Sequence, residues 1–324
     1  MVTATAMATA MATAMVTAMA TVTVRKEKRK TGKRKRNNRM KEQDNQQWDI
    51  VISPRKNLFR LNLRELWKYR DLILLFVKRD VVSVYKQTVL GPVWFVLQPI
   101  LMTITFTIVF SVIARLSTNG IPPLLFYMSG IVPWTYFSGC LMKTSNTFIG
   151  NIAIFGKVYF PRLTVPISVV ISALLSFLIQ FSLVVLLMIY YKLNGNNLIQ
   201  PNINLLLVPV LVIIMALLGL GCGIIVSALT TKYRDLKFLV GFGVQLLMYA
   251  SPVIFPLSTV EGKLKYILLA NPMTPVIEGM RFALFGKGEF NAMHLCYSAG
   301  FTLVIVIAGL GLFNKVEKSF TDTV

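Results

Sequence analysis

The sequence offers little covalent chemistry, because its reactive side chains are few and scattered. His294 is the single histidine, and the carboxylates form no cluster that suggests a zinc site or a catalytic triad. The three cysteines, Cys140, Cys222 and Cys296, lie in or beside apolar stretches and share no CxxC spacing. We interpret them as small buried hydrophobic residues. The sequence therefore predicts no catalytic residue and no metal site.

One segment superficially resembles a nucleotide-binding loop. Residues Gly150–Lys157 read GNIAIFGK. In a phosphate-binding loop four residues separate the two glycines, and a Ser or Thr after the lysine holds magnesium. Here the glycines are one residue too far apart, and Val158 replaces the hydroxyl residue. We expect no ATP on this chain, so a nucleotide that powers its function must be bound by another subunit.

The elements that position the remaining residues are apolar. Hydrophobic residues make up 55% of the 324 residues and charged residues 15%, whereas a soluble domain carries about 25% charged residues. The mean hydropathy is +0.64. A helix needs about 20 apolar residues to cross a bilayer, and its own backbone must satisfy its hydrogen bonds there. Six stretches meet this requirement: 93–114, 122–142, 165–191, 205–229, 238–256 and 296–313.

These stretches predict an all-α integral membrane protein with six transmembrane helices. No Asp, Glu, Lys or Arg lies deep within a stretch, which disfavours a proton-coupled carrier or a voltage sensor. The expected work is to move or hold something across the bilayer.

The amino-terminal segment 1–47 has a different composition. Residues 1–24 repeat Ala-Thr-Ala-Met with valine variants, and a run of Lys and Arg follows from Arg25 to Arg36. A secretory signal has its charges before the apolar stretch, so this segment is not one. We interpret it as a disordered tail; a nucleic-acid arm and a polybasic segment on anionic lipid are the alternatives. Met40 is a candidate start, because the composition becomes ordinary from there.

Residues 48–92 contain a predicted helix with an apolar side and a charged side. Asn62 and Glu65 have the spacing of a capping box, so the helix is expected over 63–88. A charge at the bilayer centre costs about 2.5–3.5 kcal/mol, and this segment carries several. We therefore predict an amphipathic helix that lies in the membrane interface. Its apolar positions recur near helical period at Leu66, Ile73, Val77, Val81 and Val84.

Loop charge predicts the topology. The connections 143–164 and 230–237 are rich in Lys and Arg, which places them and both termini in the cytoplasm. Segment 257–295 then lies outside. It holds two apolar stretches, Val260–Ala270 and Pro275–Phe285, that are too short to span. They are either re-entrant helices before the last span or helices that lie flat on the outer face.

Four further features concern packing and possible binding. Glu278 and Arg281 are three residues apart in the outer segment, where they could pair with each other or contact a substrate headgroup. Gly219 and Gly223 have the GxxxG spacing that lets another helix approach closely. Aromatic rings crowd the first two spans, where they could line a sugar pathway or could belong to an interfacial belt and the core. The aromatic candidates are Phe95, Phe106, Phe110, Tyr127, Trp134, Tyr136 and Phe137.

A series of ordered motifs gives the chain a family resemblance. The motifs are Leu63–Asp71, Arg79–Asp80, Tyr85–Trp94, Leu97–Pro99, Gly130–Trp134, Lys157–Arg162, Tyr233–Leu236, Ser251–Val253 and Asn271–Met273. Together they make residues 48–316 resemble the permease subunit of bacterial ABC-type polysaccharide exporters, which export O-antigen, capsule or teichoic acid.

The resemblance implies a homodimeric permease in the bacterial inner membrane, joined to two copies of an ABC-type ATPase that carry ATP and Mg. The cargo would be a lipid-linked glycan, and the permease domain would cover 93–314, followed by a cytoplasmic tail at 315–324. Membrane lipids are the other expected partners; no cofactor on this chain and no nucleic acid are expected.

The resemblance also implies roles for individual segments. Helix 63–88 would be a gate helix at the cytoplasmic entrance, loop 143–164 would dock the ATPase, and 257–295 would close the outer side. Headgroup attraction would fall to Trp67, Lys68, Arg70, Lys78 and Arg79, although anchoring by positive charge explains the same cations. The docking residues would be Phe155, Gly156 and Lys157.

Two alternatives to glycan export stay open. An ABC permease for a drug or another lipid would have the same architecture and a different pathway lining. A membrane-embedded glycosyl- or acyltransferase would need a catalytic histidine or paired carboxylates near one membrane face, whereas here His294 stands alone and Asp235 has only Tyr233 and Arg234 beside it.

Overall fold

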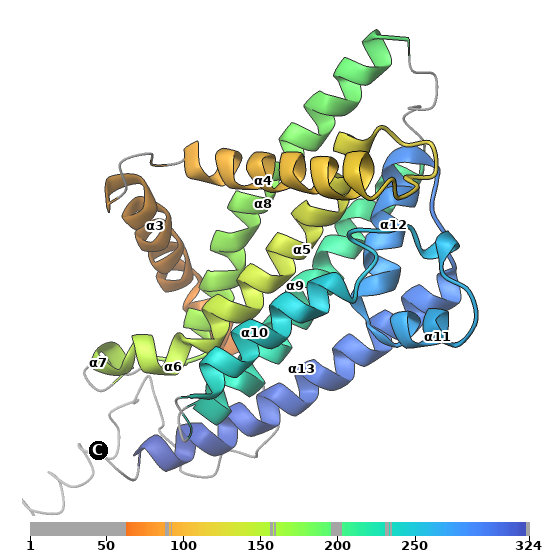
Figure 1. The fold of residues 1–324 in the computed structure, drawn as a ribbon. Coiled ribbons are helices and arrows are strands. Elements are labelled where there is room, and N and C mark those ends of the chain that lie inside the picture. The colour runs from red at the N-terminus through yellow and green to blue at the C-terminus, as the bar shows by residue number, and fades with distance from the viewer. Residues whose placement is uncertain are drawn as a thin grey trace, which may run out of the picture. The chain divides into compact units, whose positions relative to one another are not determined.

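A computed structural model describes residues 63–87, 91, 93–155, 158, 160–195, 203–230, 233 and 235–321. The predicted tail, Gly156 and Lys157 lie outside these residues. In the described residues the regular elements are helices joined by turns (Figure 1). The first half has α2 (Leu63–Lys68), α3 (Arg70–Gln87), α4 (Val93–Phe106), the π-helix η1 (Thr107–Ile113), α5 (Pro123–Ser145), α6 (Thr147–Gly150), α7 (Ile152–Phe155) and α8 (Thr164–Leu193). The second half has the 3₁₀-helix η2 (Ile203–Leu206), α9 (Leu207–Thr230), α10 (Leu236–Tyr249), the 3₁₀-helix η3 (Leu257–Thr259), α11 (Lys263–Ala270), α12 (Met273–Phe285) and α13 (Ala292–Thr321).

Five helical segments in the described residues are long and apolar enough to cross a membrane. They correspond to five of the six predicted stretches, and each begins or ends within a few residues of the prediction. The segments are Val93–Ile113, Pro123–Ser145, Thr164–Leu193, Asn204–Thr230 and Ala292–Lys315. The all-helical membrane fold expected from the sequence is therefore present.

The sixth predicted stretch, 238–256, forms a shorter helix. Helix α10 has 14 residues and ends at Tyr249, which gives a length of about 21 Å against about 30 Å of hydrocarbon. The backbone turns immediately afterwards, with Ser251 donating its N–H to Met248. Pro252 and Pro256 follow, and proline lacks the N–H that a continuing helix requires. A sixth span is therefore not confirmed.

Helix α5 lies at the centre of the packed helices. It contacts α9 on one side and α8 on the other, and α13 packs against α9 (Figure 1). Of its 18 most apolar consecutive residues, 78% are buried by its neighbours, whereas the corresponding share for the other spans is 17–39%. Helix α5 is thus enclosed by protein, and the other four spans leave large apolar surfaces for lipid.

Glycines allow the close contact between α9 and α5. A Cβ added at Gly219 would lie 2.6 Å from Cys140 Cβ, and one at Gly223 would lie 2.5 Å from Thr144 Cβ. Real Cβ atoms do not approach so closely, so the GxxxG pair faces α5 at backbone distance. On the opposite side of α9, Gly221 lies against α13.

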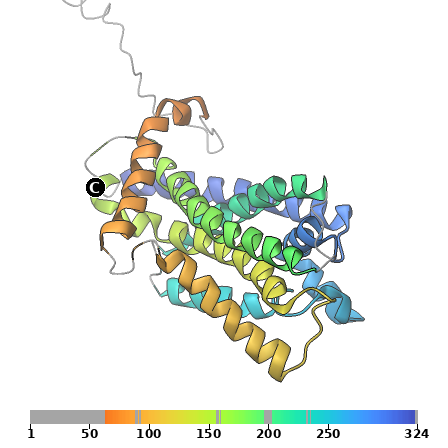
Figure 2. The same cartoon turned by 90° about the horizontal axis from the view of Figure 1, so that it is seen from above.

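Helix α3 crosses the end of the other helices instead of lying alongside them, as the second view shows (Figure 2). Tyr69 interrupts the predicted helix 63–88, which separates α2 from α3. Ile73, Phe76 and Val77 are buried, and Phe76 packs against Phe160 and Val165 at the start of α8. The apolar face predicted from the sequence is therefore covered in part by protein; its placement in a membrane interface is not confirmed.

Segment 257–295, which the sequence predicts to lie outside, contains one helix at the surface of the protein and one in its interior. Helix α11 is largely exposed, with only Leu268 buried. Helix α12 is buried along almost its whole length and contacts α5, α9 and α13. Both helices lie at the end of the bundle opposite α3, α6 and α7 (Figures 1 and 2).

Candidate functional site

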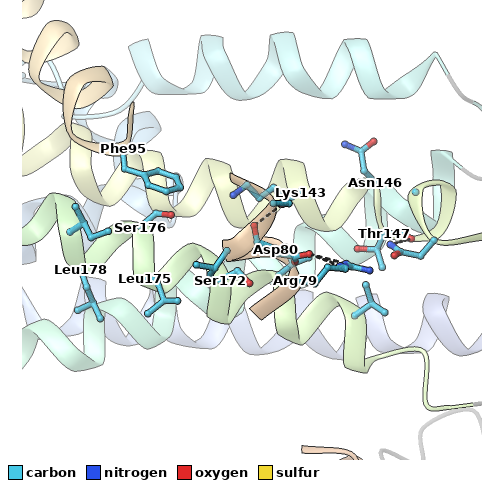
Figure 3. A pocket seen from close by; sticks show the side chains of 17 residues that line it. Arg79, Asp80, Phe95, Lys143, Asn146, Thr147, Ser172, Leu175, Ser176 and Leu178 are labelled. Atoms are coloured by element: carbon cyan, nitrogen blue, oxygen red, sulfur yellow. Dashed lines mark hydrogen bonds and ion pairs between the residues drawn. The ribbon is translucent and has the colours of Figure 1, made fainter. Parts of the chain in front are cut away.

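A cavity of about 580 Å³ opens between α3 and the ends of α5 and α8. Helix α3 forms one wall, α8 forms the facing wall, and α6 closes one end (Figure 3). The lining residues come from five elements and their junctions. They are Arg79, Asp80, Val81, Ser83, Phe95, Lys143, Asn146, Thr147, Gly150, Asn151, Val165, Val169, Ser172, Leu175, Ser176, Leu178 and Ile179.

The cavity is polar at one end and apolar at the other. Asn146 and Thr147 lie toward the α6 end. Phe95, Leu175 and Leu178 lie toward the other end, which is mostly apolar and includes the hydroxyl of Ser176 (Figure 3). Between these ends lie the charged residues of the lining, Arg79, Asp80 and Lys143. Such a site suits a ligand with a polar head and an apolar chain.

Arg79 is the one predicted headgroup residue that lines the cavity. It donates two hydrogen bonds to Asp80, at 2.8 and 3.0 Å, and its guanidinium lies 4.9 Å from the centre of the Phe76 ring. Phe76 is buried and lies three residues before Arg79 in α3, so this contact holds the guanidinium against its own helix.

The other predicted headgroup residues are solvent-exposed and lie away from the cavity lining. Trp67 is 71% exposed, and Lys68, Arg70 and Lys78 are exposed as well. The Arg70 guanidinium lies 5.9 Å from the Trp67 ring centre. Their role in headgroup attraction stays a prediction.

Contacts with α9 and α13 anchor the predicted docking loop. Phe148 in α6 donates its backbone N–H to Ser227 in α9 at 3.3 Å, and its ring stacks on Phe313 of α13 with centroids 4.8 Å apart. Thr230 of α9 donates its hydroxyl to the Ser145 carbonyl at 3.4 Å. The short helices α6 and α7 are thus fixed to the ends of the long ones.

A chain of phenylalanines connects this loop to α3. The Phe155 ring lies 6.2 Å from Phe148 and 5.7 Å from Phe160, and Phe160 lies 5.8 Å from Phe76 in α3. Phe155 therefore occupies the middle of an apolar connection between the loop and α3. Its predicted partners in docking, Gly156 and Lys157, lie outside the described residues.

Most of the aromatic candidates for a pathway lie in the core. Phe95 is half-buried and lines the cavity, and Phe110 is half-buried against the core. The buried candidates are Phe106, Tyr127, Trp134, Tyr136 and Phe137. The core accounts for these five, and a pathway role stays a prediction.

Glu278 and Arg281 form a buried ion pair in α12. Their side chains are 3% and 1% exposed, and Arg281 Nη1 lies 2.9 Å from Glu278 Oε1. Arg281 also donates from Nη2 to the Val253 carbonyl at 3.0 Å, and its guanidinium lies 3.8 Å from the centre of the Phe126 ring in α5. The pairing expected from the sequence is present, and Arg281 also contacts the segment after α10 and helix α5.

The carboxylate of this pair accepts backbone hydrogen bonds from η3 and from the turn after α12. Leu257 donates to Oε1 at 3.4 Å and Glu289 donates to Oε2 at 3.2 Å. Gly288, with φ +138°, passes so close that a Cβ there would lie 3.2 Å from Oε2. We call this set of contacts around Glu278 and Arg281 the α12 clasp. It joins these segments to α5 through the contact of Arg281 with Phe126.

The sequence did not single out most of the cavity. Asp80, Lys143, Ser172 and Ser176 line it. Lys143 reads locally as a loop charge and the two serines as small residues in a span, and the motif that contains Asp80 carries no sign of a cavity. One signal could have found the two serines: the α8 residues at 165, 169, 172, 176 and 179 lie on one helix face.

Other reactive residues form no site in the described part of the chain. Groups of three or more His, Cys, Asp or Glu residues that could hold a metal do not occur there. Cys140 is buried, Cys222 is half-buried and Cys296 is exposed, and all three are free thiols.

Comparison with known proteins places these features in context. The family described as "ABC-2 type transporter" matches residues 71–285. An O-antigen export system permease protein, RfbA, of Klebsiella pneumoniae is 28% identical over 78% of this chain and 94% of its own length. The RfbA protein of Myxococcus xanthus is 27% identical over 81% of this chain and 98% of its own length. The polysialic acid transport protein KpsM of Escherichia coli is 28% identical over 71% of this chain and 87% of its own length.

Proposed function

Because this chain belongs to the family of ABC-2 type transporters, we propose that it is the membrane-spanning permease subunit of a polysaccharide exporter. The observation that carries the proposal is its similarity to O-antigen and polysialic acid transport proteins over most of the chain. Five apolar spans and the lack of a phosphate-binding loop are consistent with a conduit that obtains its energy elsewhere. The cargo is a lipid-linked glycan that leaves the cytoplasmic side.

The working assembly is a homodimer of this chain with two ABC-type ATPase subunits. ATP and Mg bind the ATPase subunits, and this chain is not itself an enzyme. Loop 143–164 docks the ATPase and α3 gates the cytoplasmic entrance. The anchoring of Phe148 and the phenylalanine connection to α3 support this division of labour.

The chain is a multi-pass protein of the inner membrane, with both termini in the cytoplasm. Helix α12 is re-entrant and closes the outer side, and α10 with the irregular residues after it completes a sixth crossing. Two observations support this topology: α12 is enclosed by α5, α9 and α13, and α11 and α12 lie at the end of the bundle opposite α6.

Deletion of the gene in its host tests the proposal. Surface polysaccharide should be lost and lipid-linked glycan should accumulate on the cytoplasmic side, and a plasmid copy of the gene should reverse both changes. Extracted glycolipid and surface glycan are quantified in parallel with an unrelated surface protein as control. Normal surface glycan in the deletion strain, or its loss without accumulation of the precursor, would refute glycan export as the function.

A further inference from the structure

We propose that the cavity between α3 and α8 binds an anionic, phosphate-bearing lipid, with the headgroup beside Arg79 and Lys143 and the chain along α8. The inference rests on the proposed function only in treating the chain as a membrane-spanning protein. It does not require that the cargo be a glycan. The argument has three steps: the charge of the polar end, the shape of the apolar end, and the size of the cavity.

The α6 end of the cavity and the charged residues next to it together form its polar end, which presents hydrogen-bond donors suited to phosphate oxygens. The Arg79 guanidinium and the Lys143 ammonium are both cationic, and a planar guanidinium fork matches two phosphate oxygens at once. Asp80 is the sole acidic residue of the lining, so the three charged side chains carry a net charge of +1. Hydroxyl and amide groups complete this end, from Ser83, Asn146, Thr147 and Asn151.

Asp80 does not block an anion from reaching Arg79. The side chains of the pair are 41% and 28% exposed, and an ion pair that is open to solvent is weak. Arg79 can therefore exchange the carboxylate for a phosphate, or bridge the two through its remaining donors.

One face of α8 lines the cavity from its polar end to its apolar end, and we call this strip of the cavity the groove. Val165, Val169, Ser172, Ser176 and Ile179 follow one another at helical spacing on the cavity face, and 14 residues of helix extend for about 21 Å. The groove therefore starts beside the charged residues and follows α8 toward the middle of the span.

The groove opens sideways at the level of the first span. Leu175 and Leu178 line the cavity and are 43% and 51% exposed, so they face the surroundings of the protein as well as the groove. In a membrane these surroundings are hydrocarbon, and an acyl or isoprenoid chain can leave the cavity there without contact with water.

The volume limits the ligand to part of a lipid. About 580 Å³ lies in the range of small-molecule sites, roughly 300–1,000 Å³. A phosphate headgroup and the first part of a chain fit this space, whereas a polysaccharide does not. Because α3 and α6 both line the polar end, a bound headgroup contacts the proposed gate helix and the proposed docking loop together.

Lipid analysis of the purified full-length chain tests the site. The protein is reconstituted in nanodiscs that contain phosphatidylcholine with a small fraction of phosphatidylglycerol or of a long-chain polyprenyl phosphate, and the lipids that copurify after detergent extraction are quantified by mass spectrometry. The double variant Arg79→Gln/Lys143→Gln should retain at least tenfold less of a phosphate-bearing anionic lipid than the wild type. The charge-conserving Arg79→Lys/Lys143→Arg should retain most of it.

Two further variants guard against misfolding and non-specific charge effects. Lys192→Gln removes an exposed cation at the far end of α8 and should leave lipid retention unchanged. Ser172→Trp fills the groove without altering charge and should lower retention as strongly as the double charge variant. Thermal melting of every variant shows whether the chain is folded.

The two lipid arms identify the source of the ligand. Selective loss of polyprenyl phosphate supports a site for the carrier of the cargo, and selective loss of phosphatidylglycerol supports a site for a membrane lipid. If the double charge variant and Ser172→Trp each retained both lipids at the wild-type level, the inference would be overturned. The assay contains no glycan and no ATPase, so its failure is separate from failure of the proposed export function.

Discussion

Gln180 of α8 donates its side-chain amide to the backbone carbonyl of Phe95 in α4, with 3.3 Å between the two atoms. Pro99 lies four residues after Phe95 in the same helix, and it has no N–H to give to that carbonyl. Within a bilayer no water is present to take the missing place. Gln180 thus supplies the hydrogen bond that Pro99 cannot give to the Phe95 carbonyl in the first span.

Gln180→Leu should destabilise the chain because the Phe95 carbonyl would lose its partner. A buried unsatisfied group costs about 1–3 kcal/mol. In a Pro99→Ala background, alanine supplies the N–H, so Gln180→Leu should be nearly neutral there. Thermal melting of the detergent-solubilised variants measures both effects on stability.

Ser182→Ala is a suitable control, because its hydroxyl is exposed and bonds to the Ile179 carbonyl of its own helix. An equal loss of stability from Gln180→Leu in both backgrounds would show that the amide acts through packing and not through the carbonyl.

The α12 clasp supplies a second prediction. Arg281→Met should leave the buried Glu278 carboxylate without its charged partner, and breaking a buried ion pair from one side costs about 3–5 kcal/mol. Combining it with Glu278→Leu removes both charges and should recover part of that loss. Thermal melting and the yield of folded protein report the difference.

The exposed pair of Lys265 and Glu289, 2.6 Å apart with side chains 35% and 37% exposed, provides the matched comparison. Lys265→Gln should cost about 0–1 kcal/mol, as surface pairs do. Similar losses from Arg281→Met and Lys265→Gln would contradict a structural role for the clasp.

The contact between Phe76 and Phe160 predicts a defect in coupling. Phe160→Ala should loosen α3 from loop 143–164 while the fold of the spans is kept, because the phenylalanine connection lies outside the main core. In the complex with its ATPase, ATP hydrolysis should continue and surface glycan should fall. A coupling change of about 0.5–2 kcal/mol corresponds to a roughly two- to thirtyfold loss of export per ATP hydrolysed.

Phe301→Ala is the control for this experiment, since Phe301 is 36% exposed on α13 and contacts only a neighbouring ring of its own helix, Tyr297, among the described aromatic pairs. The coupling hypothesis would be abandoned if Phe160→Ala exported glycan at the wild-type ratio to ATP hydrolysis. A parallel Phe76→Ala variant, alone and combined with Phe160→Ala, should show that the two effects are not additive.

Hydropathy predicted the fold well where a single physical requirement dominates. Five predicted spans match helices in the structure because apolar length alone sets them. The stretch 238–256 does not match a helix of spanning length. Its composition is apolar throughout, but its prolines end the helix at Tyr249. Composition reports affinity for hydrocarbon, whereas helix length depends on backbone hydrogen bonds.

Tertiary neighbours decide the features that the sequence left open. The spacing of Glu278 and Arg281 predicted a pair, but the Val253 carbonyl and the Phe126 ring that complete the clasp come from distant segments. The aromatic residues could not be sorted into lining and core, because rings in both places have the same local pattern. The cavity was missed because Arg79, Lys143 and Ser172 lie in three separate elements.

The glycines of α9 give a last prediction, on helix packing. Gly219→Ala would place a methyl group 2.6 Å from Cys140 Cβ and 3.0 Å from the Phe137 carbonyl, and overpacking of this kind costs about 1–3 kcal/mol. Gly243→Ala in α10 meets nothing within 4 Å, so it should not lower the melting temperature. Cys140→Gly removes the nearer contact and should partly rescue Gly219→Ala. If Gly219→Ala melts like Gly243→Ala, α9 and α5 can separate without loss, and the close approach is not needed for stability.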